Sequence, residues 1–592
     1  MKMKMKILLL GFIILVYIPI TMGQKNSIII KNSYYPFSYP GSYMCLTRFD
    51  GRDKPLNSLK LRRIAGTGMF DLFKIELIRN GKVISDVQNI MRPEKYTLKS
   101  GDDSLEICFQ SSRIIRFKST NIGFRLTTER TGQYMPMNSD QARMVFAWPD
   151  YHKFIITSLN GKQILKQQSP DENQLKYNAG LFLDFPAQIN EMVEIVLEEY
   201  ISEWEPINYH KKFDECVLEA WRNYMKFLNK MPAVPSEFTQ TVKEAVYLNW
   251  ASIVEPRGFI NRDAILMSKN WMSYVWSWDH CFNAIAMSYF NPELAWDQMM
   301  VIFDKQDNIG CLPDAVNDKL IVWYATKVPI HGWAIKQMMN VEGAVSDTML
   351  KEIYDPLSKW TNFYLKYRDE NKNGIPQQNS GNETADNATI YDMGIPVESP
   401  DLCAHLIYQM DVLAEIAGKL KKPNDSIIWK SKADNLQSLM IKNLWNGTNF
   451  IYKISENNQV VDRPFCFLSY MPIVISYRLP KEINDKLISG IEKYLITPKG
   501  IASESPQSEL YQSDGYWRGP IWAPVVHLMV TGIDNAGKKD LAKKVAYSFC
   551  KTVDGSGFSE NFNAITGEGL YDPAYTWTSS VFISLAHEYG FN

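Results

Sequence analysis

The sequence has no surplus of charge of either sign and no long run of like charges. Its 592 residues include 64 Lys and Arg against 65 Asp and Glu, which leaves a net charge of −1. Binding to nucleic acid or to an anionic membrane surface depends on a clear excess of positive charge. We therefore expect no nucleic-acid partner and no electrostatic attachment to a membrane.

Cysteine is sparse, and its spacing does not form the usual metal or redox motifs. The eight cysteines are far apart, none belongs to a C-x-x-C pair, and several lie within apolar helical patterns. Isolated cysteines in such patterns behave as small hydrophobic residues. The sequence predicts buried thiols and does not require disulfides, although export would permit them.

Long apolar runs are also absent, except at the amino terminus. A lysine-rich start is followed by an apolar run from Ile7 to Ile20 and by small residues up to Gly23. This order is typical of a secretory signal peptide over residues 1–23, because the apolar run is short for a membrane span. The alternative is an uncleaved anchor. No cysteine follows the predicted cut, so we expect a secreted or periplasmic protein with no lipid anchor and no membrane span after cleavage.

Residues 24–205 carry the pattern of an antiparallel β-sandwich. Several short segments alternate apolar with polar residues, and Asn80-Gly81 and Asn160-Gly161 are hairpin turn signals. Residues 206–234 then predict a linking helix that ends before the prolines at 232 and 235.

Residues 235–592 change to a helical period. Segments with few charges alternate with amphipathic, charged ones, and a helix that is apolar on all sides is buried on all sides. Six buried helices interleaved with six half-exposed ones predict an (α/α)6 toroid with an inner and an outer ring. The twelve predicted segments lie near 236–254, 279–290, 292–306, 329–341, 345–368, 399–419, 424–445, 464–477, 480–496, 520–533, 537–552 and 576–589.

Motifs rich in aromatic and polar residues precede the predicted inner helices. In an alternating toroid the N-terminal ends of these helices share one mouth, so the motifs converge on a single pocket. Aromatic faces and planar polar groups are typical of a sugar-binding pocket. Core packing is the alternative for each tryptophan taken singly. The candidate sugar-binding residues are Trp276, Trp278, Asp279, Trp333, Glu398, Trp517, Arg518, Asn563 and Trp577.

Two acidic side chains over this mouth would suffice for glycoside cleavage. One protonates the leaving oxygen, and the other activates a water from about 6.5–9.5 Å away if the water attacks directly. Glu560 lies in a stretch of glycines, aromatics and amides, residues 556–577, between the last two helices. Its partner would come from the polar connection over 380–401. Spacing alone does not choose among the four candidates Glu383, Asp386, Asp392 and Glu398, whereas Asp401 has the position of a first-turn helix acid.

Three motifs give the chain a resemblance to a known family. WSWD at 276–279, YWRGPIW at 516–522 and ENFNAITGEG at 560–569 resemble glycoside hydrolase family 63 and, more distantly, the inverting trehalases. The motifs extend over residues 270–592, and the resemblance reaches the β domain only by architecture. It implies an inverting hydrolase of a terminal α-glucosidic bond, acting on an oligosaccharide or small glucoside and needing no cofactor.

The same resemblance assigns the two catalytic roles. It implies Asp386 as the general acid and Glu560 as the general base that deprotonates the attacking water. The sequence around Asp386 keeps Asn387 but lacks the family's preceding Glu-Ser-Gly, and Glu383 is the nearest rival for the acid. Around Glu560 the sequence keeps Asn563, with an alanine where the family has proline.

A further motif has the form of the start of a calcium loop. Asp369, Asn371 and Asn373 place oxygen ligands at alternate positions and are followed by a glycine. The twelfth loop position is Ser380 rather than glutamate, so the motif is incomplete. Some relatives of the family carry a calcium ion near this connection, so a structural calcium ion is one expectation and a polar turn is the other.

Two other classes of protein compete with the hydrolase. A non-catalytic glycan-binding protein of the cell envelope would explain export and aromatic residues, but it gives the two loop carboxylates no task. Other carbohydrate enzymes of toroid fold, a phosphorylase or a lyase, would need a phosphate pocket or a basic groove instead of Glu560 among aromatics and amides.

Overall fold

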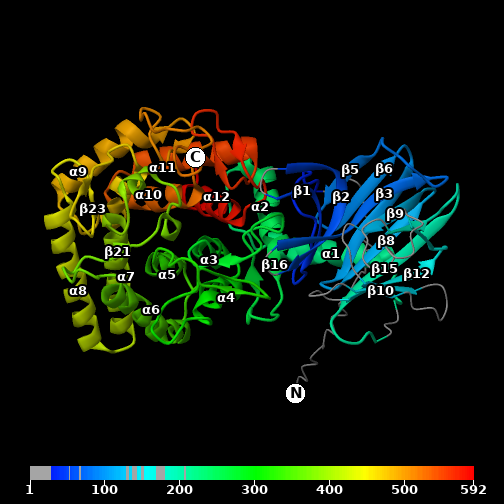
Figure 1. Cartoon of the computed structure of the whole chain (residues 1–592), viewed down its shortest axis with the longest axis horizontal. Helices are drawn as coiled ribbons and strands as arrows, with labels where there is room; N and C mark the ends of the chain where they lie inside the picture. Colours follow the sequence, from blue (N-terminus) through cyan, green and yellow to red (C-terminus); the bar gives the residue numbers. More distant parts are fainter. Residues whose placement is uncertain are drawn as a thin grey trace, which may run out of the picture.

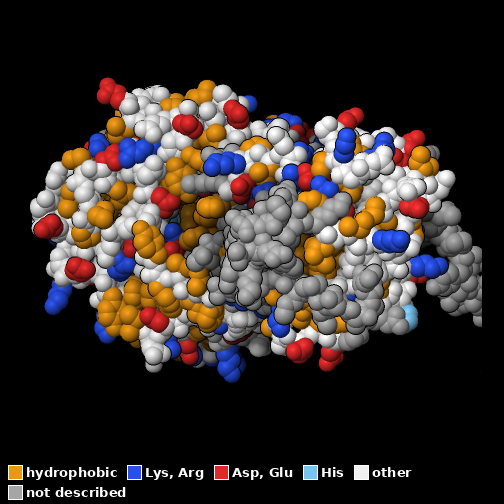
Figure 2. Space-filling model, turned by 45° about the vertical axis from the view of Figure 1, so that its right-hand side comes forward, with side chains coloured by type: hydrophobic (Ala, Val, Ile, Leu, Met, Phe, Trp, Pro, Cys, Tyr) orange, Lys and Arg blue, Asp and Glu red, His pale blue; other side chains and the backbone are white. Residues whose placement is uncertain are grey.

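The computed structural model describes residues 28–51, 54–65, 68–128, 133–135, 143–147, 153–167, 181–205 and 209–591. The predicted signal peptide, 1–23, lies outside these residues. Within the described part of the chain, no helix combines the length and the apolar character needed to cross a bilayer. A body of β-strands lies beside a body of helices, with α1 and α2 at the junction (Figure 1). Acidic and basic side chains are interspersed over the face seen in Figure 2, as the near-zero net charge predicts.

Two antiparallel sheets form the N-terminal domain, as predicted. One sheet has the order β1-β2-β3-β9-β14-β13 with β4 paired to β3, and the other has the order β10-β11-β12-β15-β8-β7-β6-β5. Apolar residues alternate inward, so that Phe117 faces Ile195 across β8 and β15 and stacks on Phe124 of the other sheet, with ring centroids 5.9 Å apart. The strands are β1 Met44–Asp50, β2 Lys54–Ala65, β3 Gly68–Arg79, β4 Lys82–Val83, β5 Gln88–Arg92, β6 Lys95–Ser100, β7 Asp103–Ser111, β8 Ile114–Thr120, β9 Gly123–Thr128, β10 Gln133–Met135, β11 Arg143–Ala147, β12 Lys153–Asn160, β13 Ile164–Gln167, β14 Leu181–Phe185 and β15 Met192–Tyr200.

One of the two predicted hairpin turns is confirmed and the other is wrong. Asn80 and Gly81 both have positive φ, 51° and 76°, and join β3 to β4 in a two-residue hairpin. Asn160 and Gly161 instead lie where the chain leaves one sheet for the other, because β12 and β13 belong to different sheets. A turn signal fixes the local backbone but does not choose the sheet that the next strand joins.

The helical domain is an (α/α)6 toroid, as predicted. Its inner helices contact one another in a closed cycle, α3, α5, α7, η6, α10, α12 and back to α3. The outer helices α4, α6, α8, α9 and α11 pack around this cycle (Figure 1). The helices are α1 Phe213–Leu228, η3 Ser236–Phe238, α2 Thr239–Ser252, α3 His280–Ser288, α4 Pro292–Phe303, α5 His331–Asn340, α6 Asp347–Tyr367, η4 Gly381–Glu383, η5 Thr389–Met393, α7 Pro400–Lys419, α8 Pro423–Leu444, η6 Phe467–Ile475, α9 Lys481–Gly490, η7 Ile491–Leu495, α10 Ala523–Asn535, α11 Lys539–Ser556 and α12 Thr576–Tyr589.

Short strands brace the loops of the toroid. They include the three-stranded sheet β18-β19-β20, which lies at the mouth of the ring before α5. The short strands are β16 Ile253–Val254, β17 Ala264–Ile265, β18 Val275–Trp276, β19 Ala315–Val316, β20 Ile321–Val322, β21 Gln377–Gln378, β22 Val397–Glu398, β23 Tyr452–Ile454, β24 Val460–Val461, β25 Ile496–Thr497, β26 Gly500–Ile501, β27 Asn561–Phe562 and β28 Gly569–Leu570.

Two helices depart in detail from the predicted pattern. The eighth predicted segment forms the 3₁₀-helix η6, with Pro472 inside it, because proline removes an α-helical hydrogen bond. The outer helix α2 is almost entirely buried, since α1 and the β domain cover its outer side. Trp250 Nε1 donates to Asn223 Oδ1 of α1 at 2.8 Å, and Tyr247 Oη donates to Pro36 O at 3.0 Å.

A buried cluster of charges joins the two domains. Arg63 of β2 donates from Nε to Glu199 Oε1 at 2.8 Å and from Nη2 to Asp318 Oδ2 of the toroid at 3.1 Å. Arg257 of the toroid donates to the second oxygen of Glu199 at 2.9 Å. Breaking such a pair would leave an uncompensated charge in the interior, so these contacts fix how the domains dock.

Candidate active site

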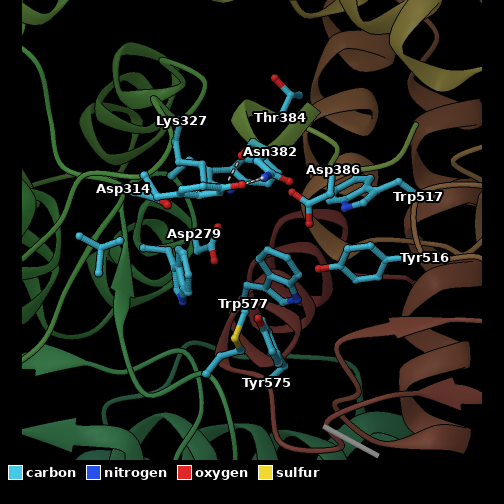
Figure 3. Close-up of a pocket in the computed structure, with 15 residues that line it drawn as sticks. Asp279, Asp314, Lys327, Asn382, Thr384, Asp386, Tyr516, Trp517, Tyr575 and Trp577 are labelled. Carbon is cyan, nitrogen blue, oxygen red and sulfur yellow. Dashed lines mark hydrogen bonds and ion pairs between the residues drawn. The ribbon is translucent and has the colours of Figure 1, made fainter. Parts of the chain in front are cut away.

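A cavity of about 330 Å³ opens at the mouth of the inner ring (Figure 3). Tryptophan, tyrosine and carboxylate side chains surround it, which is the mixture expected of a carbohydrate pocket. Its lining consists of Met272, Trp276, Trp278, Asp279, Asp314, Val322, Tyr324, Lys327, Asn382, Thr384, Asp386, Tyr516, Trp517, Tyr575 and Trp577.

The cavity lies where the N-terminal ends of inner helices were predicted to meet. Trp276, Trp278 and Asp279 directly precede α3, Lys327 precedes α5, and Trp517 precedes α10. At α12, Tyr575 and Trp577 flank the first helical residue. Segments that are about three hundred residues apart in the sequence therefore supply one site. The motifs before α7 and η6 contribute nothing to the lining.

The aromatic wall of the cavity is rigid. Trp517 stacks face to face on Trp522, with ring centroids 3.9 Å apart and planes 1° apart. Trp577 meets both Trp522 and Trp278 edge on, at 5.6 and 6.0 Å. Such interlocked rings lose little freedom when a ligand binds, and their exposed edges and faces can pack against a sugar.

Asp386 is half-buried and points into the cavity opposite Asp279 (Figure 3). The next residue, Asn387, fastens this loop to the YWRG turn. Asn387 Oδ1 accepts from Trp517 N at 3.0 Å, Asn387 Nδ2 donates to Gly515 O at 3.1 Å, and Arg518 Nε donates to Asn387 O at 2.8 Å. The loop that carries Asp386 is thus held against the loop that carries Trp517.

Glu383, the rival for the acid, does not line the cavity. Its Oε1 accepts from Arg368 Nη2 at 2.7 Å, and its Oε2 accepts from Asn379 N at 3.0 Å. Burial raises the pKa of Glu383, and the Arg368 guanidinium opposes that rise. Both carboxylate oxygens have structural partners, so the geometry favours Asp386 over Glu383 for contact with a ligand.

Glu560 is fully buried in the layer behind the cavity wall. Its backbone carbonyl accepts from Trp577 Nε1 at 3.1 Å, and its backbone N–H donates to Asp572 O at 2.8 Å. The predicted base is therefore not among the lining residues, and it lies behind Trp577, which is one of them.

Asp279 links the two predicted catalytic carboxyl groups. Burial raises the pKa of Asp279 well above its ordinary value, Lys327 opposes this, and the carboxylates of Asp314, Asp386 and Glu560 raise it further. The charges of both Asp386 and Glu560 therefore act on the Asp279 carboxyl group. Its Oδ1 is buried without a hydrogen-bond partner, and a buried polar atom of this kind is suited to a ligand hydroxyl.

Asp314 and Tyr324, which the loop over 311–326 supplies to the lining, were not among the predicted site residues. Asp314 is held by its backbone, since Ser277 N donates to Asp314 O at 2.9 Å and Asp314 N donates to Val322 O at 2.8 Å. Burial raises the pKa of Asp314, while Lys327 lowers it. The available signal was the length of this connection, which runs from the outer helix α4 to the mouth end of the inner helix α5.

Four predicted sugar-binding residues lie outside the cavity lining and hold the structure instead. Trp333 is buried between the rings of Phe282 and His527. Arg518 pairs with both carboxylate oxygens of Asp392. The other two are Glu398, a buried acceptor for Asn371 and Asn373, and Asn563, whose Oδ1 accepts from the N–H groups of Ile565 and Thr566 at 2.9 and 3.0 Å.

The predicted calcium loop is a tight polar turn whose side chains converge on Glu398. Asp369 accepts from the N–H groups of Asn373 and Gly374, each at 3.0 Å. Asn371 Nδ2 and Asn373 Nδ2 lie 2.9 and 2.5 Å from Glu398 Oε1. Carboxylate and amide oxygens are ligands that Ca²⁺ takes, but here the amides of Asn371 and Asn373 donate through nitrogen to Glu398, and both oxygens of Asp369 accept from backbone N–H groups.

The fold and this site define a glycoside hydrolase. Residues 272–578 match the mannosylglycerate hydrolase MGH1-like glycoside hydrolase domain, and the chain belongs to this family, within glycoside hydrolase family 63. The mannosylglycerate hydrolase MGH1 of Selaginella moellendorffii is 18% identical over 394 residues, which cover 53% of this chain and 80% of that protein. The resemblance predicted from the sequence motifs is confirmed.

Solved structures confirm the fold. The family 63 mannosylglycerate hydrolase of Thermus thermophilus, in complex with glucose, has a TM-score of 0.50 at 16% identity and covers 58% of this chain and 99% of its own. A bacterial glucoamylase in complex with acarbose has a TM-score of 0.62 at 13% identity and covers 96% of this chain and 95% of its own. The glucoamylase match therefore extends over the β domain as well as the toroid.

Proposed function

We propose that the protein is an inverting hydrolase that removes a terminal α-linked hexose, with Asp386 as general acid and Glu560 as general base. The observation that carries the proposal is the cavity: Asp279 and Asp386 line it, and Glu560 lies directly behind it, bonded through its backbone carbonyl to the lining residue Trp577. The α-glucosidic bond expected from the sequence remains the first candidate. A second candidate is the bond between a mannosyl group and glycerate, because the relatives are named mannosylglycerate hydrolases.

The catalytic steps follow from the position of each group. The terminal sugar occupies the closed end, where Asp279, Tyr575 and Trp577 surround it. Asp386 donates its proton to the glycosidic oxygen, and the bond from that oxygen to the anomeric carbon breaks. Glu560 removes a proton from the water that attacks the anomeric carbon from the opposite face, so the product is inverted.

Asp279 has a binding role in this scheme. Burial keeps the pKa of Asp279 high, so its carboxyl group can donate a hydrogen bond to a sugar hydroxyl as well as accept one. The aromatic wall excludes water around the reacting bond, which strengthens each electrostatic contact made there.

Replacement of the two carboxyl groups tests the proposal. Asp386→Asn and Glu560→Gln should each lower kcat roughly 10²–10⁴-fold, the usual contribution of general acid or base catalysis. Glu568→Gln is the matched control, because Glu568 is an exposed acid in the same loop as Glu560. NMR of the first product from an α-glycoside should show the β-anomer.

Two results would contradict this assignment. A variant of Asp386 or Glu560 with near-wild-type kcat would remove that residue from the mechanism. An α-anomeric first product would show retention and exclude direct attack by water.

The proposal also includes export and a structural ion. The lysine-rich, apolar start of the chain supports secretion or transfer to the periplasm. The residue types of Asp369, Asn371, Asn373 and Glu398 support a structural calcium ion that takes no part in the chemistry.

A further inference from the structure

The cavity has a closed end and an exposed rim. Asp279, Tyr575 and Trp577 are nearly without exposed surface, whereas Tyr324 is 77% exposed although it lines the same cavity. On the proposed function, the terminal sugar takes the closed end and its leaving group, the aglycone, extends toward the rim. The residues of the rim therefore decide which aglycone is accepted.

Tyr324 presents an aromatic face at this rim. Its hydroxyl accepts a hydrogen bond from Asn382 Nδ2 at 3.0 Å, and Asn382 also lines the cavity. This contact fixes the direction of the ring while leaving most of the side chain in solvent. A fixed, exposed aromatic ring is suited to the apolar face of a sugar or polyol.

The charges of the lining do not suit an anionic aglycone. The lining has three carboxyl groups, those of Asp279, Asp314 and Asp386, and one cationic side chain, Lys327. In the proposed mechanism Asp279 and Asp386 carry protons, which leaves Asp314 as the counter-charge of Lys327. Lys327 Nζ donates to Asn382 O, lies 3.5 Å from Asp314 Oδ1 and lies 5.6 Å from the centre of the Trp276 ring. The one ammonium group of the lining therefore already has a hydrogen-bond acceptor and a carboxylate partner within the protein.

Arg518, a cation close to the Asp386 loop, also has its partners within the protein. Arg518 pairs with both oxygens of Asp392 and donates to Asn387 O, and it does not line the cavity. A carboxylate at the rim would lose part of its hydration without gaining an unmatched cation from the lining residues. Burial of a charge without a partner is unfavourable and is a common means of rejecting a ligand.

We propose that this cavity takes a glycoside whose aglycone is an uncharged sugar or polyol resting on Tyr324, in place of the glycerate acid in the substrate named for its relatives. The inference rests on the proposed function for the direction of the substrate. It assigns a substrate class that differs from that of the family's named members.

A matched pair of substrates provides the test. Glucosylglycerol and glucosylglycerate differ by one hydroxymethyl group against one carboxylate, and the mannosyl pair differs in the same way. For the full-length enzyme, kcat/KM should favour the neutral member roughly 10- to 100-fold, because the carboxylate would lose hydration without gaining a counter-charge. Equal rates, or faster cleavage of the glycerate compound, would overturn the inference.

Variants of Tyr324 test whether its ring binds the aglycone. Tyr324→Ala should raise KM for the neutral glycoside roughly 3- to 10-fold with little change in kcat, because stacking is lost. Tyr324→Phe keeps the ring and should stay within about 2-fold of wild type. Tyr367→Ala is the control, since Tyr367 is 40% exposed on the outer helix α6 and outside the cavity. A KM for Tyr324→Ala equal to that of this control would refute stacking of the aglycone on Tyr324.

Binding separates a failure of this inference from a failure of the proposed function. Calorimetry with the Glu560→Gln variant should show tighter binding of glucosylglycerol than of glucosylglycerate. That preference would support the inference even if the wild type cleaved no α-hexoside, a result that would remove only the catalytic proposal. Tighter binding of the glycerate compound would overturn the inference whatever the turnover.

Discussion

Asp572 gives the stability of the enzyme a pH dependence that can be worked out from its surroundings. Its side chain is fully buried beside the backbone of Glu560. Oδ1 accepts from Ala574 N at 3.0 Å and from Asn270 Nδ2 at 3.3 Å. Burial raises the pKa of Asp572 from 3.8 to about 6, hydrogen bonds from Ser268 and Ala574 partly offset this, and Glu560 adds to the rise.

The sign of the effect follows from the raised pKa. The folded protein holds the Asp572 proton more tightly than the unfolded chain, so the stabilisation is complete below pH 3.8 and is lost as pH rises through about 6. A rise from 3.8 to about 6 corresponds to a loss of roughly 3 kcal/mol. In a chain of this size, a loss of this free energy of unfolding lowers the melting temperature by about 2–4 °C, depending on how much of the protein unfolds together.

Replacement of Asp572 by asparagine should remove this dependence. Scanning calorimetry of wild type and Asp572→Asn, at intervals from about pH 4 to 7.5, should show that the wild type loses about 2.4 kcal/mol more over this range. Asp485→Asn is the control, because Asp485 is exposed and a hydrogen bond from Lys481 lowers the pKa of Asp485. Identical pH dependence in wild type and Asp572→Asn would refute the reasoning, since every other titrating group is common to both proteins.

Two further predictions concern the packing of the inner ring and the polar turn. Gly332→Ala should lower stability by about 1–3 kcal/mol, because a Cβ there would lie 2.5 Å from Gln409 Cα. Gly418→Ala, in open space at the end of α7, should be neutral or slightly stabilising, and equal melting temperatures for the two variants would contradict the packing argument. Calcium at 100 times its Kd should stabilise the protein by about 2.7 kcal/mol relative to EDTA-treated protein, and Glu398→Gln should reduce this gain. Unaltered melting on chelation would count against the ion.

The fold was predictable because its regularities are local. Charged helices such as α11 and apolar ones such as α12 alternate along the chain, and this alternation alone separates an outer ring from an inner one. What the pattern could not show was the cover that other parts of the chain provide. Trp250 of α2 is buried by α1, and no feature of the α2 sequence distinguishes that burial from packing within the ring.

The site was predictable in part, for a related reason. Residues directly before an inner helix, such as Asp279 and Trp517, are placed at the mouth by the topology. The direction of each side chain, however, does not follow from the topology. Trp333 begins α5 at the same mouth, but its ring turns toward Phe282 and His527. Tyr324 lies in a loop without periodicity, where neither position nor direction follows from the local sequence.

The contacts that secure Glu560 explain why the β domain belongs to the catalytic unit. Thr47 Oγ1 of β1 donates to Asn270 Oδ1 at 2.8 Å, and Asn270 Nδ2 lies 3.3 Å from Asp572 Oδ1. Asp572 O in turn accepts from Glu560 N at 2.8 Å. These side-chain contacts join residues 223 and 302 positions apart, a separation at which periodicity carries no information. A domain whose described residues contribute none to the lining can therefore still fix the position of the proposed base, because each link is buried and short.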